Sequence, residues 1–404
     1  MITRRLNVLK LLEKGVSILL LGPRGTGKTN LIKLTLPQVG PQIHIDLLRG
    51  GEFQRFLNSP QLLGEEVRER LKSVAGILVV AIDEIQKLPA LLDEVHALIE
   101  DHKGHLAFIL SGSSARKLRR GGANLLAGRA LSHYLHPLHA SELDLNLAKS
   151  LRLGTLPAVY FASDDLATPM LQSYVSTYLR EEIQQESLVR AIDRFGRFLE
   201  YAGQVNGEPV NFSKLSKQIG VAGKTVAEYY SILVDTLIAV QLPGWSASVK
   251  KQLVQAPKFY FFDCGVLNAI NGYLQVELRQ SNPLYGRLFE NFVITQIHAS
   301  NDYEGLGLKF YYWRDKSGKE VDLIIARNVA TPLAAVEIKS SPTPDPDDCR
   351  GFDAFAEDYP NLPRICICGT PRPYSKSGIL FIPWQDALKN LGSLVSMEKT
   401  AQST

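Results

Sequence analysis

Apolar runs alternate with helix-like segments over the first 140 residues of the chain. Four short apolar runs predict strands at 16–21, 42–47, 76–82 and 106–110. The run at 76–82, GILVVAI, contains no polar residue, which is typical of a strand buried on both faces. Helical spacing predicts helices at 30–36, 65–72 and 91–101. Strands that alternate with helices favour βαβ units around a parallel sheet.

Beyond residue 140 the pattern changes twice. Up to about residue 192 it is mostly helical, with loops expected at 154–157 and 163–169. Two helical segments joined by IGVAG and two short strands are then expected at 212–218, 224–237, 237–242 and 258–262. From residue 284 the pattern predicts a helix at 288–300, strands at 309–313, 320–326 and 334–339, and a Pro/Asp-rich loop at 340–348.

Composition places few limits on function. The 404 residues suffice for roughly two to four domains, and 45% hydrophobic with 21% charged residues is an ordinary globular mixture. The formal net charge of +4 is too small to diagnose nucleic-acid binding. Four cysteines without a C-x-x-C pair favour reduced thiols in a cytoplasm. No signal peptide is recognisable, and no stretch of about 18 apolar residues predicts a membrane span.

A glycine-rich loop stands between the first predicted strand and the first predicted helix. Its sequence has the spacing G-x-x-x-x-G-K-T and comprises Gly22, Pro23, Arg24, Gly25, Thr26, Gly27, Lys28 and Thr29. The glycines allow successive backbone N–H groups to point at one anion, and the following helix adds its positive dipole end. Lys28 then reaches the β- and γ-phosphates, and the Thr29 hydroxyl is a magnesium ligand.

Polar residues follow the two apolar strands downstream. Asp83 and Glu84 come directly after GILVVAI, so we expect Asp83 to hold the magnesium and Glu84 to polarise the attacking water. The alternative is a solvated strand end. Ser111 ends the strand at 106–110 and could bond the γ-phosphate or the water, although a plain Ser/Gly turn would have the same sequence.

Taken in order, these stretches resemble AAA-type P-loop ATPases. The strings GPRGTGKT, VVAIDEIQKLP, ILSGSS and LLAGRALSHYLHPLHASE carry the resemblance. They look most like a prokaryotic branch in which this module is fused to a C-terminal region long described as of unknown function. The later strings are PKFYFFDCGVLNAI, LFENFVI, YYWRDKSGKEVDLII and AVEIKSS. The resemblance implies ATP and Mg²⁺ as ligands and a homo-oligomer.

The resemblance also adds Arg129 as a candidate arginine finger or sensor, acting on its own subunit or on a neighbour. A surface arginine beside the basic residues Arg116, Lys117, Arg119 and Arg120 is the alternative. His133, His136 and His139 are spaced H-x-x-H-x-x-H, but Pro137 interrupts a continuous helix, so we expect structural or surface histidines.

The segment around 212–245 has the layout of a winged helix. Leu215, Ile219, Val226, Tyr230 and Leu233 would face its core. Its basic residues are few, namely Lys214, Lys217, Lys224, Lys250 and Lys251, and acidic and aromatic residues accompany them. Docking of DNA or RNA and packing against protein, including a protein partner, both remain open.

Four ionic residues in the last third have the order of a restriction-endonuclease-like core. Glu290 lies on a predicted helix, Asp322 on a strand, and Glu337 and Lys339 share one face of the next strand. The carboxylates could hold Mg²⁺ or Mn²⁺, and Lys339 could orient the water that attacks a phosphodiester. Solvated edges or a recognition scaffold could retain the same residues.

The predicted fold class is α/β: an AAA-type P-loop domain with a parallel sheet and a helical lid, then a winged helix and a restriction-endonuclease-like α/β domain. The expected boundaries are 1–140, 141–195, 196–255 and 256–395. The predicted function is magnesium-dependent ATP hydrolysis coupled to a nuclease-like, nucleic-acid-associated domain in a cytoplasmic protein. Two alternatives stay open: an ATP-gated metal-dependent nuclease, and a nucleotide-controlled binding switch, against which Glu84 weighs.

Overall fold

The computed structural model describes residues 2–113, 126, 128–179, 192–246, 248, 252 and 255–396. Ser114, the basic residues at 116–120, and Lys250 and Lys251 of the expected wing lie outside this set. The chain forms two compact units, Met1–Pro137 with Asp235–Ile238, and Leu138–Val234 with Ala239–Thr404. Within the described part of the chain, no helix is long and apolar enough to cross a bilayer.

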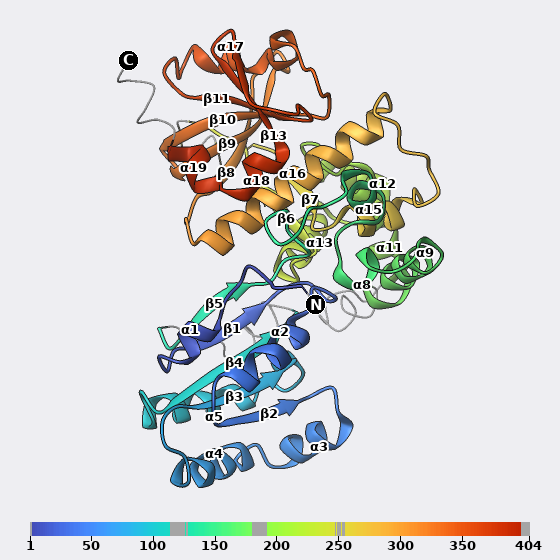
Figure 1. The fold of residues 1–404 in the computed structure, drawn as a ribbon. Coiled ribbons are helices and arrows are strands. Elements are labelled where there is room, and N and C mark those ends of the chain that lie inside the picture. Colours follow the sequence, from blue (N-terminus) through green and yellow to red (C-terminus); the bar gives the residue numbers. More distant parts are fainter. Residues whose placement is uncertain are drawn as a thin grey trace. The chain divides into compact units, whose positions relative to one another are not determined.

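The N-terminal unit is built on the parallel sheet that the sequence predicts (Figure 1). Its strands are β1 (Ser17–Leu21), β2 (Gln42–Asp46), β3 (Leu78–Asp83), β4 (Leu106–Gly112) and β5 (Ala130–Tyr134), in the order β2-β3-β4-β1-β5. All neighbouring strands run parallel, so their carboxyl ends lie along one edge. The phosphate loop and both polar strand ends therefore share that edge.

Helices provide the apolar cover of this sheet. They are α1 (Leu9–Leu12), α2 (Lys28–Thr35), α3 (Gly50–Asn58), α4 (Leu62–Lys72) and α5 (Leu91–Asp101), with short 3₁₀ turns η1 (Leu36–Gln38) and η2 (Ile85–Lys87). The core joins strand residues such as Val80 and Leu110 to helix residues such as Val95 and Leu98. Helix α5 has the bounds that its spacing predicts. Helix α3 and strand β5 carry no clear apolar run, and the sequence analysis missed both.

The first part of the C-terminal unit is helical. Its elements are α7 (Leu147–Leu153), α8 (Pro157–Tyr160), α9 (Asp164–Ser173), the π-helical η4 (Tyr174–Leu179) and α11 (Ile192–Gln204). The loop expected at 163–169 is wrong, because helix α9 covers it and contains Pro169. Acidic residues in its first turn favour the start of a helix, and Pro169, in the middle of the helix, removes only the one backbone hydrogen bond that an N–H at this position would have donated.

A helix–turn–helix follows, as the spacing predicts. Helix α12 (Phe212–Ile219) begins at Asn211, whose side chain accepts from the Lys214 N–H, and ends at the left-handed Gly220. Helix α13 (Gly223–Asp235) leads to the antiparallel pair β6 (Ala239–Leu242) and β7 (Lys258–Phe261), and α15 (Cys264–Asn271) comes next. Tyr229 and Tyr230 are buried against Phe198, so these two aromatic side chains pack within the protein.

A mixed six-stranded sheet forms the last part of the chain (Figure 1). Its strands are β8 (Lys309–Arg314), β9 (Glu320–Asn328), β10 (Thr331–Lys339), β11 (Arg364–Cys368), β12 (Tyr374–Lys376) and β13 (Ile379–Pro383). Helix α16 (Pro283–Glu304) begins after Asn282, which caps it, and ends at Gly305. The remaining elements are η5 (Pro346–Cys349), α17 (Gly351–Ala356), α18 (Trp384–Lys389) and α19 (Leu391–Ser396).

Candidate functional site

The glycine-rich loop connects β1 to α2 and is shaped by backbone conformations that favour glycine. Gly25 and Gly27 have φ angles of 82° and 96°, in the left-handed region. A Cβ on Gly22 would lie 2.3 Å from the carbonyl oxygen of Leu135, which follows β5. Glycine is therefore required at position 22 by close approach of the backbone and at the other two by their torsion angles.

Lys28 is the first residue of α2, and its side chain turns back into the loop. It is 5% exposed, and its Nζ donates to the carbonyl oxygens of Gly22 (2.7 Å) and Pro23 (3.0 Å). Thr29 follows in the first turn of the helix, where backbone N–H groups have no intrahelical acceptors. The end of α2 thus combines an ammonium group with a positive helix dipole, and this favours an anion.

Arg4 is a residue of this site that the sequence analysis missed. Its guanidinium donates to the carbonyl oxygen of Thr26 at 2.6 Å and to that of His136 at 2.7 Å. These bonds tie the phosphate loop to the segment after β5. Arg4 lies outside the glycine motif, and no local sequence signal marks it.

Asp83 ends β3 and is completely buried. One carboxylate oxygen, Oδ1, accepts a hydrogen bond from the Ser111 hydroxyl at the tip of β4. The other, Oδ2, is buried and has no hydrogen-bond partner among the described residues. A buried carboxylate oxygen is costly without a partner, and Mg²⁺ prefers such oxygen ligands. The donors at this edge therefore fit a magnesium ion.

Glu84 adopts a left-handed backbone conformation, with φ of 59°. Its N–H donates to the Ser111 Oγ at 3.1 Å, and its Oε2 accepts from the Gln86 amide at 2.5 Å. Burial raises the pKa of Glu84 above its ordinary value, the Lys28 ammonium opposes this, and the Asp83 carboxylate adds to it. A non-glycine residue in this conformation is strained, and such strain is found at functional positions.

Gln86 links the two polar strand ends. Besides Glu84, its amide donates to Ser113 Oγ at 3.1 Å, so one side chain spans β3 and β4. The sequence analysis overlooked Gln86, although it lies two residues after Glu84 in DEIQ. Its contacts restrain the orientation of the Glu84 carboxylate.

Arg129 lies at the amino ends of the strands, opposite the carboxyl ends that carry the phosphate loop. The next residue, Ala130, aligns with Ser17 at the start of β1, whereas the phosphate loop follows Leu21 at its end. Five strand residues span roughly 13–17 Å. Arg129 instead pairs with Glu100 on α5. The structure does not bring Arg129 together with the phosphate loop of its own chain.

The three histidines do not form a metal site. Among the residues that the structure describes, no group of three His, Cys, Asp or Glu side chains could hold a metal ion. His139 is buried, with its ring nitrogens 2.8 Å from Ser141 Oγ and 3.1 Å from the Gln296 carbonyl oxygen. This histidine has a structural role in the C-terminal unit.

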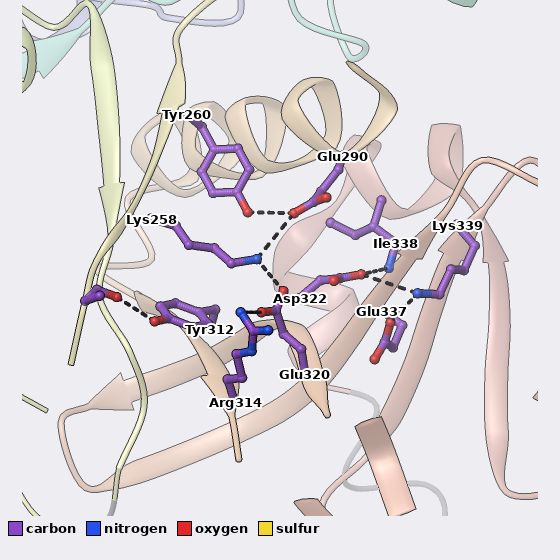
Figure 2. Close-up of polar contacts among 11 residues, drawn as sticks. Lys258, Tyr260, Glu290, Tyr312, Arg314, Glu320, Asp322, Glu337, Ile338 and Lys339 are labelled. Atoms are coloured by element: carbon purple, nitrogen blue, oxygen red, sulfur yellow. Dashed lines mark hydrogen bonds and ion pairs between the residues drawn. The ribbon is translucent and has the colours of Figure 1, made fainter. Parts of the chain in front are cut away.

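A second ionic site lies on the mixed sheet of the C-terminal unit (Figure 2). Lys339 Nζ is 2.6 Å from Glu337 Oε2 and 3.9 Å from Asp322 Oδ2, and the Ile338 N–H donates to the same Asp322 oxygen at 2.8 Å. Burial raises the pKa of Glu337 well above its usual range, and the Asp322 carboxylate adds to this. Asp322, Glu337 and Lys339 therefore lie together, as the sequence places them.

Glu290 points into the same region from α16, but it is engaged differently. The Tyr260 hydroxyl donates to Glu290 Oε1 at 2.6 Å, and Lys258 Nζ lies 3.8 Å from that oxygen (Figure 2). Burial raises the pKa of Glu290 to about 7, against the Lys258 ammonium. Lys258 and Tyr260 are absent from the predicted site, although both belong to the string PKFYFFDCG.

The expected set of three metal-binding carboxylates needs correction. Glu290 contacts Lys258 and Tyr260, while Asp322 and Glu337 share Lys339, so the described residues offer no group of three carboxylates arranged for one ion. Glu290 on the helix was expected to meet Asp322 and Glu337 on the strands because the three residues follow the order of a restriction-endonuclease-like core. Strand β7 precedes the helix and the sheet in the sequence. It contributes Lys258, which pairs with Glu290 in place of a metal ion shared with Asp322 and Glu337.

The N-terminal part of the chain matches a known domain family. Residues 15–144 match the family described as an AAA domain, which includes the phosphate loop and the ends of β3 and β4. The match makes this region an AAA-type domain. Asp83, Glu84 and Ser111 lie at the sheet edge that carries its phosphate loop.

The rest of the chain matches families without an assigned role. Residues 145–277 and 285–387 match DUF8612 and DUF4143, both described as domains of unknown function. Uncharacterized proteins of Mycobacterium tuberculosis and Mycobacterium bovis are each 27% identical over 335 residues, which cover 82% of this chain and 72% of theirs. The sequence similarity to these relatives therefore extends well beyond the AAA-type domain.

Two solved structures show weaker likeness. A Walker-type ATPase of Pyrococcus abyssi is 16% identical, with a TM-score of 0.45 over 65% of this chain and 92% of its own. The Holliday junction branch migration motor RuvB of Thermotoga maritima is 18% identical, with a TM-score of 0.28 over 58% of this chain and 87% of its own. Likenesses of this strength do not bear on function.

Proposed function

We propose that the chain is a magnesium-dependent ATPase in which nucleotide turnover at the AAA-type domain controls the C-terminal unit. One observation supports this most strongly. Asp83 has a buried carboxylate oxygen without a hydrogen-bond partner in the described part of the chain, and the Lys28 ammonium lies inside the phosphate loop at the same sheet edge. Such an arrangement suits a triphosphate with its divalent ion.

The proposed roles follow from position. Loop N–H groups and Lys28 bind the phosphates, and Thr29 and Asp83 would hold the Mg²⁺, which neutralises phosphate charge when bound. Glu84 accepts a proton from the attacking water, Gln86 orients Glu84, and Ser111 holds Asp83 in place. Arg129 could act as an arginine finger only on the nucleotide of a neighbouring subunit, so this role requires a homo-oligomer.

Replacement of Lys28 by alanine tests the ATPase proposal. We expect the Kd for ATP to rise about 10- to 100-fold, because a charge-assisted contact to phosphate is lost. Isothermal titration with ATP and Mg²⁺ measures this change, and phosphate release should fall in parallel. Lys33→Ala, an exposed lysine on the same helix, is the matched control. Unchanged ATP binding in Lys28→Ala would contradict the proposal.

A second candidate function is ATP-gated, metal-dependent cleavage of nucleic acid at the second ionic site. This site, with the charged residues around it, is called the C-terminal cluster below. The observation that favours it is the juxtaposition of Asp322, Glu337 and Lys339 on adjacent strands. The two carboxylates would hold the ion, and Lys339 would orient the attacking water. DNA or RNA is then the partner. If the cluster does not cleave, the domain acts as a binding scaffold under nucleotide control.

Cleavage assays distinguish these two outcomes. Plasmid and single-stranded DNA and RNA are incubated with Mg²⁺ or Mn²⁺, with and without ATP. We expect Asp322→Ala to reduce cleavage about 100-fold, because it removes a ligand of the ion. Asp353→Ala, an exposed aspartate of the same unit, should leave cleavage unchanged. Absence of metal-dependent cleavage from the unmodified protein under every condition would reject the nuclease.

A further inference from the structure

A buried lysine enters the C-terminal cluster from outside the mixed sheet. Lys258 is the first residue of β7, and its side chain is 3% exposed. Its Nζ pairs with Glu320 of β9, lies 3.8 Å from Glu290 of α16, and lies 5.1 Å from the centre of the Tyr312 ring (Figure 2). A buried ammonium is costly unless it is paired, and here two carboxylates and an aromatic face surround it.

The backbone around Lys258 is fixed independently of these ion pairs. The carbonyl oxygen of Ala256 accepts from the Tyr312 hydroxyl at 2.5 Å, and that of Pro257 accepts from the Val210 N–H at 2.9 Å. Lys258 itself pairs with Leu242 across the β6–β7 hairpin. The ammonium therefore enters the cluster from a strand whose backbone is positioned by hydrogen bonds to other elements.

The charges of the cluster limit what else it can hold. Four carboxylates, from Glu290, Glu320, Asp322 and Glu337, face three cations, from Lys258, Arg314 and Lys339. The ionised set carries one net negative charge. One divalent cation together with one phosphodiester would bring the total to zero. A second divalent cation would leave two uncompensated positive charges in a region of low dielectric constant.

We propose that Lys258 is a resident cation of this cluster, which binds Glu290 and Glu320 in place of a second divalent ion. The site then takes a single divalent ion, at Asp322 and Glu337. This inference rests on the second candidate function, the metal-dependent nuclease. Lys258 acts through Glu290 and Glu320, so it is a positioning residue, and Tyr260 assists it by donating to Glu290.

Counting bound Mn²⁺ tests the inference without any measurement of activity. The full-length protein, free of nucleotide, is titrated with Mn²⁺ while electron paramagnetic resonance reports the free ion. The same titration is carried out on Asp322→Asn, and the number of ions that this variant binds is subtracted. Any ion at the phosphate loop is present in both titrations, so it does not contribute to the difference. We expect a single such ion in the unmodified protein and a second one in Lys258→Met, because Glu290 then loses the Lys258 ammonium and Glu320 keeps only Arg314, 3.9 Å away.

Two results decide against the inference in different ways. Two Asp322-dependent ions in the unmodified protein would show that Lys258 does not replace an ion, while the metal-dependent function would stand. No Asp322-dependent ion would overturn both. Lys258→Arg, which keeps the charge, should retain a single ion. If Lys258→Met does not fold, Lys258→Gln replaces it, because its amide removes the charge but can still donate hydrogen bonds to Glu290 and Glu320, and a second ion is again expected.

Discussion

ATP turnover is expected to fall by about 100- to 10,000-fold when Glu84 is replaced by glutamine, while ATP remains bound. The substitution retains the shape of the side chain and removes its basicity. Because Lys28, Thr29 and Asp83 are untouched, the Kd for ATP should change little. Phosphate release and filter binding of labelled ATP measure the two quantities separately. Glu65→Gln, an exposed glutamate on α4, is the matched control.

The pH dependence of turnover provides a second measure of Glu84. Burial raises its pKa above the ordinary value of 4.5. A general base works when deprotonated, so kcat should decline as pH falls through a pKa higher than that of an exposed glutamate. Equal turnover by Glu84→Gln and the unmodified protein, or an acid limb at the ordinary carboxyl pKa, would contradict the assignment.

Replacement of Gly265 by alanine is expected to lower the free energy of unfolding of the C-terminal unit by about 3 kcal/mol. Gly265 lies in the first turn of α15, where a Cβ would stand 2.1 Å from the Leu153 carbonyl oxygen at the end of α7. The obstacle is backbone, which cannot rotate away. The two helix ends are also joined by Asp263, which accepts from the Thr155 N–H at 2.6 Å.

Tryptophan fluorescence during urea unfolding measures this effect selectively. The chain has three tryptophans, Trp245, Trp313 and Trp384, and all belong to the C-terminal unit. Gly196→Ala is the control, since no atom of the described residues lies within 4 Å of its added Cβ in helix α11, and alanine should be neutral or stabilising by up to about 1 kcal/mol. A Gly265→Ala midpoint equal to that of the unmodified protein would refute the packing argument.

Segments with strong periodicity were predictable. The four apolar strands and helix α5 carry their pattern in consecutive residues, and the phosphate loop carries its chemistry in eight. Strand β5 was missed because its position at the side of the sheet leaves all five of its residues partly or fully exposed, so it shows no apolar run. Helix α3 was missed because it opens with Gly50 and Gly51, which favour turns.

The site residues show the same difference between local sequence patterns and long-range contacts. The sequence predicts roles for Asp83, Glu84 and Ser111 because strand ends mark them, whereas Gln86 and Arg4 make contacts that no sequence motif indicates. For Arg129 the resemblance left open whether it acts on its own subunit or on a neighbour, and the strand register places Arg129 at the opposite end of the strands from its own phosphate loop.

By itself, the sequence determined the nucleotide loop, the parallel sheet that holds it, and the carboxylates and lysine of the last strands. These features depend on neighbouring residues, so short-range patterns are sufficient to reveal them. Only the tertiary structure decided that Lys258 meets Glu320, 62 residues later, and that Tyr260 meets Glu290, 30 residues later. Such pairs depend on how a hairpin, a helix and a sheet pack, and packing has no period along the chain.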